Sequence, residues 1–343
     1  MQANNANIFF VIFCAFVMSA CESFDTKNHS LSTQTATNNT TSVKQIAKKD
    51  PIKRFDFPKK DSSGKIFYLD KYHSKTDFDT DKKEELYNLK EVLKTDLGID
   101  FKTKTYNKYF NIAYRCTDAQ ANALEYVSSV FFRDTYSKYF LYEPPHPFSI
   151  VYFATKEEFE KHTKTTAYGF YRPSEKTLYT YTGSGEGTLW HELMHAFMYA
   201  NIEHDTQQWF SEGFASFYEM GAIQQNKFIE GYTNWRLPLL QAMLKKEKNM
   251  PLNLFLAEED MSEDNAYAKA RFLFCYLWVY DKIIPFSKSY MYDLSAKYKG
   301  KQLALKSIEK IEELVGKPFA EIEKEYNSMA FKYQKYQKLS VKI

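Results

Sequence analysis

The sequence predicts an α+β protein in which a sheet with helices is followed by a mainly helical C-terminal part. Residues 109–114 and 176–182 alternate in the manner of strands with one buried face. Residues 148–153 form an apolar run that fits a buried strand. Beyond residue 218, apolar residues recur mostly at helical spacing. An aromatic content of 17% supplies ample material for a core.

Caps and chain breakers fix the expected order of the first elements. Gly98 stops a helix, Thr117 caps a second helix and Thr155 caps a third. Three prolines between residues 144 and 147 interrupt the chain before the apolar strand. The expected order is helix 82–97, strand 109–114, helix 118–140, strand 148–153, helix 156–161 and strand 176–182. The helices expected in the C-terminal part are 232–246, 266–280, 301–315 and 319–336.

The functional prediction depends on the motif HELMH at residues 191–195. Residues four apart lie one above the other on a helix, so His191 and His195 can bind one metal ion. Glu192 lies about 100° further round the helix, beside the ion. At that position its carboxylate can accept a proton from a metal-bound water. Ser184 or Thr188 is expected to cap this helix.

A third ligand is expected on a second helix, within the segment WFSEGFASFYE at residues 209–219. Glu212 follows His195 by 17 positions, enough for the first helix to end and a second to return antiparallel. Zinc in a hydrolytic site takes three protein ligands and keeps one position open. His204 is the alternative third ligand. The simplest alternative to a metal site is two histidines at the edge of the core and a solvated glutamate on unrelated helices.

The two segments together resemble the gluzincin branch of zinc metallopeptidases, and more closely its peptidase MA-like families. The resemblance extends over residues 106–333 and includes the strand FSIVYF, the run TAYGFY and the pair Ala266 and Tyr267. It implies a zincin-like fold, with a mixed sheet whose edge strand lies over the HExxH helix. Residues 176–182 are expected to be that edge strand, to which a peptide substrate could add.

The resemblance also implies the roles of the site residues. It implies zinc (Zn²⁺) as the cofactor, bound by His191, His195 and Glu212, with Glu192 as the general base. Tyr267 is the candidate for a second electrophile that stabilises the oxyanion, since relatives often place a Tyr or His on a later helix. Glu219 is expected to orient a ligating histidine through its other ring nitrogen.

The expected function is therefore that of a zinc-dependent metallopeptidase acting on a peptide or protein substrate. One alternative is a binding or scaffold protein that keeps the zincin fold without proteolysis. Another is a zinc amidase that acts on cell-wall material. Nucleic acid is not expected as a partner, because the net charge is only +3 and no basic stripe with interleaved aromatics is present outside the C-terminal tail.

The N-terminal segment predicts a location in the cell envelope. Residues 8–17 form an unbroken apolar run that fits a signal peptide. The following MSAC resembles a bacterial lipobox, which implies cleavage before Cys21 and a membrane anchor through lipid on that residue. The polar segment 22–64 is expected to be a flexible tether. Residues 65–105 are expected to form a helical extension, and residues 106–343 the metallopeptidase domain.

Two cysteines remain in the expected folded part. Cys116 and Cys275 could form a disulfide in an oxidising compartment, or both could be buried free thiols.

Overall fold

The computed structural model describes residues 89–342, apart from residues 92, 96, 107, 108, 203, 247, 248, 259, 260, 262 and 263. The signal peptide expected at residues 1–21, the tether at 22–64 and the lipidation site Cys21 lie outside the described residues.

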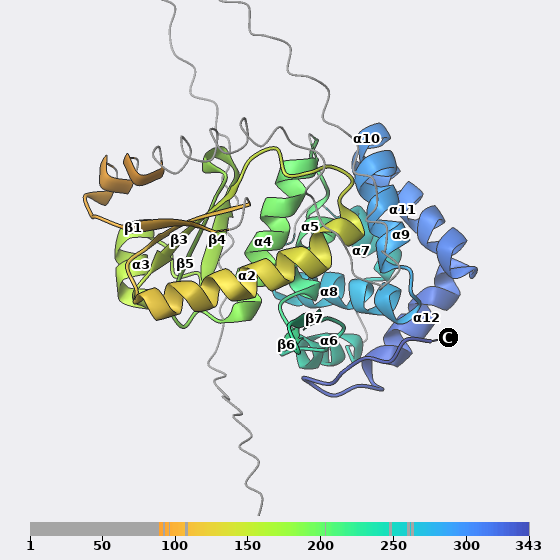
Figure 1. Cartoon of the computed structure of the whole chain (residues 1–343). Coiled ribbons are helices and arrows are strands. Elements are labelled where there is room, and N and C mark those ends of the chain that lie inside the picture. The colour runs from red at the N-terminus through yellow and green to blue at the C-terminus, as the bar shows by residue number, and fades with distance from the viewer. Residues whose placement is uncertain are drawn as a thin grey trace, which may run out of the picture.

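A mixed five-stranded sheet forms one side of the molecule, as Figure 1 shows. Its strands are β1 (Lys102–Tyr106), β2 (Phe110–Tyr114), β3 (Phe148–Phe153), β4 (Gly169–Arg172) and β5 (Thr177–Tyr181). Their spatial order is β1-β2-β3-β5-β4. Strands β2, β3 and β5 run parallel, while β1 and β4 pair antiparallel at the two edges. The expected α+β class with a mixed sheet is thus present.

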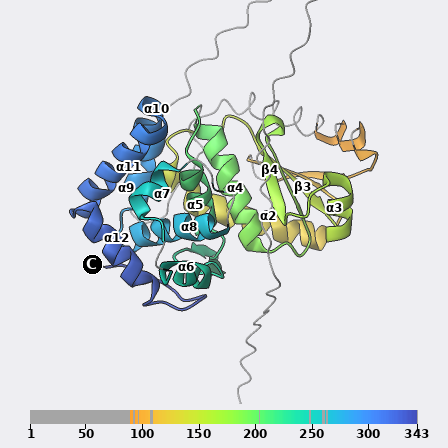
Figure 2. The same ribbon diagram turned by 180° about the vertical axis from the view of Figure 1, so that it is seen from behind.

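Two expectations about the sheet were wrong. Residues 102–105 do not belong to a helical extension, because they are part of β1, which pairs with β2. Residues 177–181 do not form the edge strand, because β5 lies between β3 and β4. Every residue of β5 is buried, as expected for an interior strand. The edge strand on that side is β4, which lies nearest to helix α4 in both Figure 1 and Figure 2.

Helices cover both faces of the sheet. Helix α2 (Asp118–Tyr139) begins with a capping box between Thr117 and Gln120, so the expected cap is confirmed. The expected cap on α3 (Lys156–Thr163) is confirmed too, because the Thr155 side chain accepts a hydrogen bond from the backbone of Glu158. Alternate strand residues serve the two faces. Ile112, Ile150 and Leu178 pack in the large core with α2. Ala113, Val151 and Tyr179 pack on the other face with α3 and with Leu89, Leu93 and Leu97.

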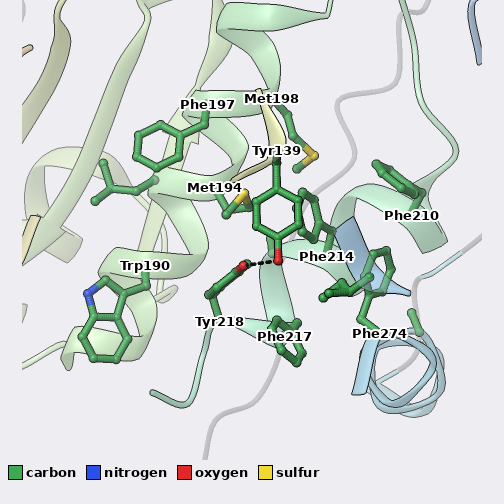
Figure 3. Close-up of a cluster of buried hydrophobic side chains, with 14 of the residues drawn as sticks. Tyr139, Trp190, Met194, Phe197, Met198, Phe210, Phe214, Phe217, Tyr218 and Phe274 are labelled. Carbon is green, nitrogen blue, oxygen red and sulfur yellow. Dashed lines mark hydrogen bonds between the residues drawn. The ribbon is translucent and has the colours of Figure 1, made fainter. Parts of the chain in front are cut away.

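Helices α4 (Glu186–Asn201) and α5 (Gln208–Phe217) follow the sheet and pack against each other through buried aromatic and methionine side chains. Figure 3 shows Met194 and Met198 of α4 and Phe214 of α5 in one buried cluster with Tyr139. Tyr218 donates a hydrogen bond to Tyr139 of α2 at 2.7 Å, which ties the end of α5 to α2. The expected caps of α4 were wrong, because the N-cap is Gly185 at φ +93°, without a side-chain cap.

A hairpin interrupts the helical C-terminal part. Strands β6 (Ala222–Gln224) and β7 (Lys227–Ile229) pair antiparallel where only helices were expected. The helices that follow are α6 (Leu237–Leu244), α7 (Leu252–Ala257), α8 (Asp264–Val279), α9 (Ile283–Ser289), α10 (Ser295–Lys297), α11 (Gly300–Val315) and α12 (Phe319–Ala330). A 3-10 turn at Pro173–Glu175 and a π-helical turn at Tyr290–Leu294 complete the elements.

Helix α6 is shorter than the expected helix 232–246, because the chain before it is held in extended form. The backbone N–H of Thr233 donates to the carbonyl of Gln337, and that of Leu339 to the carbonyl of Gly231. Tyr232 forms an isolated bridge with Lys338. The C-terminal segment 334–339 therefore fixes residues 231–233.

Cys116 and Cys275 are both buried and free, which decides between the two alternatives for the cysteines. No helix within the described ranges is both long enough and apolar enough to cross a bilayer.

Candidate metal centre

Helix α4 presents two imidazole rings to one point. His191 and His195 are one helical turn apart, and their Nε2 atoms lie 3.1 Å from each other. Both side chains are only about one tenth exposed. The larger side chains around them, such as Leu193 and Met194, are fully buried in the core. The apolar face of α4 thus fixes the direction in which the two rings project.

Glu212 of helix α5 meets the two rings. Its Oε2 atom lies 3.4 Å from Nε2 of His191 and 3.5 Å from Nε2 of His195. One ligand atom from each of the three residues lies within 4.8 Å of the others. The alternative ligand His204 is elsewhere, because its Nε2 lies 2.8 Å from the hydroxyl of Ser295. The structure therefore brings Glu212, and not His204, to the two histidines.

The donor set fits a zinc ion. Oε2 of Glu212 is buried and has no hydrogen-bond partner among the described residues. An uncompensated buried carboxylate oxygen is costly, whereas a cation at the same point would satisfy it. Two imidazole nitrogens and one carboxylate oxygen are the ligands that catalytic zinc sites use. This geometry argues against the alternative of two unrelated core-edge histidines and a solvated glutamate.

The charges of the cluster perturb one another strongly. Burial disfavours the charge on Glu212, but His195 and His191 outweigh this effect and hold the pKa of Glu212 well below its usual range. Burial likewise disfavours charge on His191, yet the neighbouring carboxylates of Glu212 and Glu219, each 3.4 Å from a ring nitrogen, raise its pKa to about 10. The carboxylates thus favour a cation at this point in the molecule.

Glu192 lies next to the three candidate ligands but does not belong to the group that could hold the ion. Its Oε1 atom is 4.0 Å from Nε2 of His191. Burial raises the pKa of the Glu192 carboxyl, while His191 and His195 oppose that rise. The backbone of Tyr171 in edge strand β4 donates a hydrogen bond to this carboxylate. A buried carboxyl group with a raised pKa is suited to accept and return a proton.

Glu219 lies behind the first histidine. Its Oε1 atom is 3.4 Å from Nδ1 of His191. Arg236 binds both oxygens of Glu219 at 2.9 Å, and Asn234 donates to Oε2 at 2.8 Å. Burial would raise the pKa of Glu219, but Arg236 and His191 hold it below its usual range. The carboxylate is therefore fixed in place and can fix the ring of His191 in turn.

Sequence reasoning did not find Arg236 and Asn234. They follow Glu219 by 17 and 15 positions, and the β6–β7 hairpin returns them to it. Neither belongs to a motif, so no local signal could have identified them.

The structure places Tyr267 on α8 against the same arginine. The centre of its ring lies 5.0 Å from Cζ of Arg236, and the side chain is buried. Arg236 therefore contacts both Tyr267 and Glu219. Its role as an electrophile stays a prediction.

No known family model matches this chain, and no curated protein gives a significant match.

Proposed function

We propose that the protein is a zinc-dependent peptidase of the gluzincin type. One observation carries this proposal: the ligand atoms of His191, His195 and Glu212 meet around a buried carboxylate oxygen that lacks a hydrogen-bond partner among the described residues. The buried Glu192 beside them supports a hydrolytic role, because a purely structural metal site has no use for a carboxylate there that is not a ligand.

The residues of the chain have distinct parts in the proposed reaction. His191, His195 and Glu212 would hold zinc, which supplies Lewis-acid polarisation of a water molecule and of the peptide carbonyl when bound. Glu192 takes the proton of the attacking water and returns it to the leaving amine. Tyr267 is the proposed donor to the developing oxyanion. Glu219, held by Arg236, keeps His191 in the orientation that a ligand needs.

The test is a comparison of cleavage by wild-type protein and the Glu192→Gln variant, on a library of peptides from a digested proteome. Wild-type protein should cleave peptides, and Glu192→Gln should lower the rate at least about 10²-fold because it removes the proton acceptor. Both proteins should contain about one zinc per chain by metal analysis, because this substitution leaves all three ligands intact. His191→Ala should lose both metal and activity.

Other results of the same experiment would favour the alternatives. Identical peptide profiles from zinc-loaded wild-type protein and Glu192→Gln would contradict the peptidase and favour a scaffold. Release of products from purified cell-wall fragments, without cleavage of any peptide, would favour an amidase. Glu175→Gln, on the turn next to β4 and paired with Arg172, is the control that should leave activity unchanged.

We also propose that the protein is anchored in the cell envelope through lipid on Cys21. The proposal is supported by the apolar segment 8–17 and the lipobox-like MSAC that follows it. Wild-type protein should incorporate a labelled fatty acid and sediment with membranes. Cys21→Ser should do neither. If Cys21→Ser took up no labelled fatty acid but still sedimented with membranes, the lipid anchor would be contradicted.

A further inference from the structure

The open edge of strand β4 lies beside the candidate metal centre. Strand β4 is the last strand of the sheet, and no described strand pairs with its outer edge. The backbone N–H of Tyr171 donates to the carboxylate of Glu192 on α4, so β4 lies directly beside the candidate site. The other backbone groups on an unpaired edge of this kind can pair with an extended peptide as an additional strand.

The side chain of Tyr171 lies on the same side of the sheet as α4. Neighbouring side chains on a strand point to opposite faces. Phe170 packs with the core under α3, whereas Tyr171 packs with the core that contains α4. Arg172 lies 5.3 Å from the ring of Phe170, so its charge is on the opposite side from Tyr171. On the face of the sheet that carries α4, β4 thus presents the uncharged aromatic side chain of Tyr171.

Tyr199 of helix α4 completes an aromatic pair. Its ring centroid lies 5.7 Å from that of Tyr171, with the ring planes inclined at 34°. Tyr199 remains 60% exposed, so its ring is accessible to a ligand. It follows His195 by four positions and Glu192 by seven, so all three lie along one stripe of the helix. Helical side chains lean toward the N-terminus, so the ring of Tyr199 covers the turn that carries His195.

We propose that Tyr171 and Tyr199 form a subsite for an aromatic or large apolar side chain of a peptide that lies along the β4 edge. The proposal rests on the proposed peptidase function and adds a substrate preference to it. Seven helical residues span about 10 Å, which is the length of about three residues of an extended peptide. The preferred aromatic or apolar side chain of the substrate is therefore expected within about three positions of the peptide bond that is cleaved.

The proposal is tested first by binding, in the full-length, zinc-loaded Glu192→Gln protein. Peptides selected from a random decapeptide display library should share Phe, Tyr, Trp or Leu at one position. Adding Tyr199→Ala should weaken binding of a selected peptide on the order of tenfold and abolish that enrichment. Adding Tyr199→Phe should retain both, because the ring remains. Tyr126→Ala is the matched control, since Tyr126 is an exposed tyrosine on α2.

Unchanged enrichment after Tyr199→Ala, selected peptides without a shared apolar position, or no peptide binding would each overturn the subsite. Cleavage by protein with an intact Glu192 separates this inference from the proposed function. Aromatic-selective binding without any cleavage would contradict the peptidase and leave the subsite standing. Cleavage that shows no aromatic or apolar preference within three positions of the cut would support the peptidase and contradict the subsite.

Discussion

Gly187 lies against the backbone carbonyl of Glu219, so closely that a Cβ atom at position 187 would overlap the carbonyl oxygen. Gly187 and His191 are one turn apart on the same face of α4. The backbone of Glu219 therefore packs against the first turn of the helix, while its side chain reaches Nδ1 of His191 on the next turn. The absence of a side chain at Gly187 thus allows Glu219 to come close enough to contact His191.

Gly187→Ala should weaken zinc binding although residue 187 contacts no ligand atom. The added methyl group must push Glu219 away, which should lower the zinc affinity about 10- to 100-fold and the free energy of unfolding by about 1–3 kcal/mol. Zinc titration against a competing chelator and denaturant unfolding would measure the two effects. Glu186→Ala, at the exposed neighbouring position, is the control. An unchanged zinc affinity would show that Glu219 does not support His191.

Arg236→Met should be among the most harmful substitutions outside the three ligands. It leaves the buried Glu219 carboxylate without its cation, which costs about 3–5 kcal/mol in buried ion pairs. Arg236→Lys should be intermediate, because lysine keeps the charge but cannot bind both oxygens as a fork. Unfolding free energy and zinc affinity should both decline in the order wild type, Lys, Met. Arg172→Lys, in a more exposed ion pair with Glu175, should change stability by less than about 1 kcal/mol. Equal stability of wild type and both Arg236 variants would show that the ion pair between Arg236 and Glu219 does not stabilise the fold.

The stability of the metal-free protein should decrease from about pH 6.5 to pH 10. The pKa of His191 is about 10 in the folded chain against an ordinary value of 6.5, so the folded state binds the proton more tightly. This stabilisation is complete below pH 6.5 and is lost as the pH rises to 10, with an upper limit of about 5 kcal/mol.

Denaturant unfolding in excess chelator, with His191→Gln compared at each pH, would isolate this contribution. The difference between the two proteins should shrink as the pH rises. His162→Gln should follow wild type over this range, because burial lowers the pKa of His162 below its ordinary value. A difference that does not depend on pH would contradict the proton assignment.

Tyr267→Phe should separate a catalytic hydroxyl from a packing residue. If the hydroxyl donates to the oxyanion, its loss should reduce kcat about 10²-fold with little change in KM. Zinc content and unfolding should stay near wild type, because the ring against Arg236 is kept. Steady-state kinetics on one cleaved peptide would measure this. Tyr276→Phe, a buried tyrosine further along α8, is the control. Equal kcat values for wild type and Tyr267→Phe would assign Tyr267 to packing.

The helices of the site could be predicted because their signals are local. The spacing of His191 and His195 follows from one helical turn, and the apolar residues between them locate the buried face. The 17 positions between His195 and Glu212 leave enough chain to turn back, and Glu212 does meet both histidines. The caps Thr117 and Thr155 were also readable, because a cap depends on residues within three positions of it.

The remaining features depend on pairing between distant segments, which one sequence does not display. The pattern of residues 177–181 fits an interior strand as well as an edge strand, so only the position of β4 decides between them. The β6–β7 hairpin was missed because its turn uses Gln225 and Asn226 at positive φ, without the glycine that usually marks such a turn. Arg236 depends on that hairpin and was missed with it.

The backbone pairing between residues 231–233 and 334–339 has a consequence for biosynthesis. Thr233 is held by a segment that the ribosome makes about a hundred residues later. Asn234 and Arg236 follow Thr233 within three positions, so their approach to Glu219 becomes anchored only when translation has passed residue 337. The contact of Glu219 with His191 therefore gains its full support late, after the synthesis of both helices that carry the three candidate ligands.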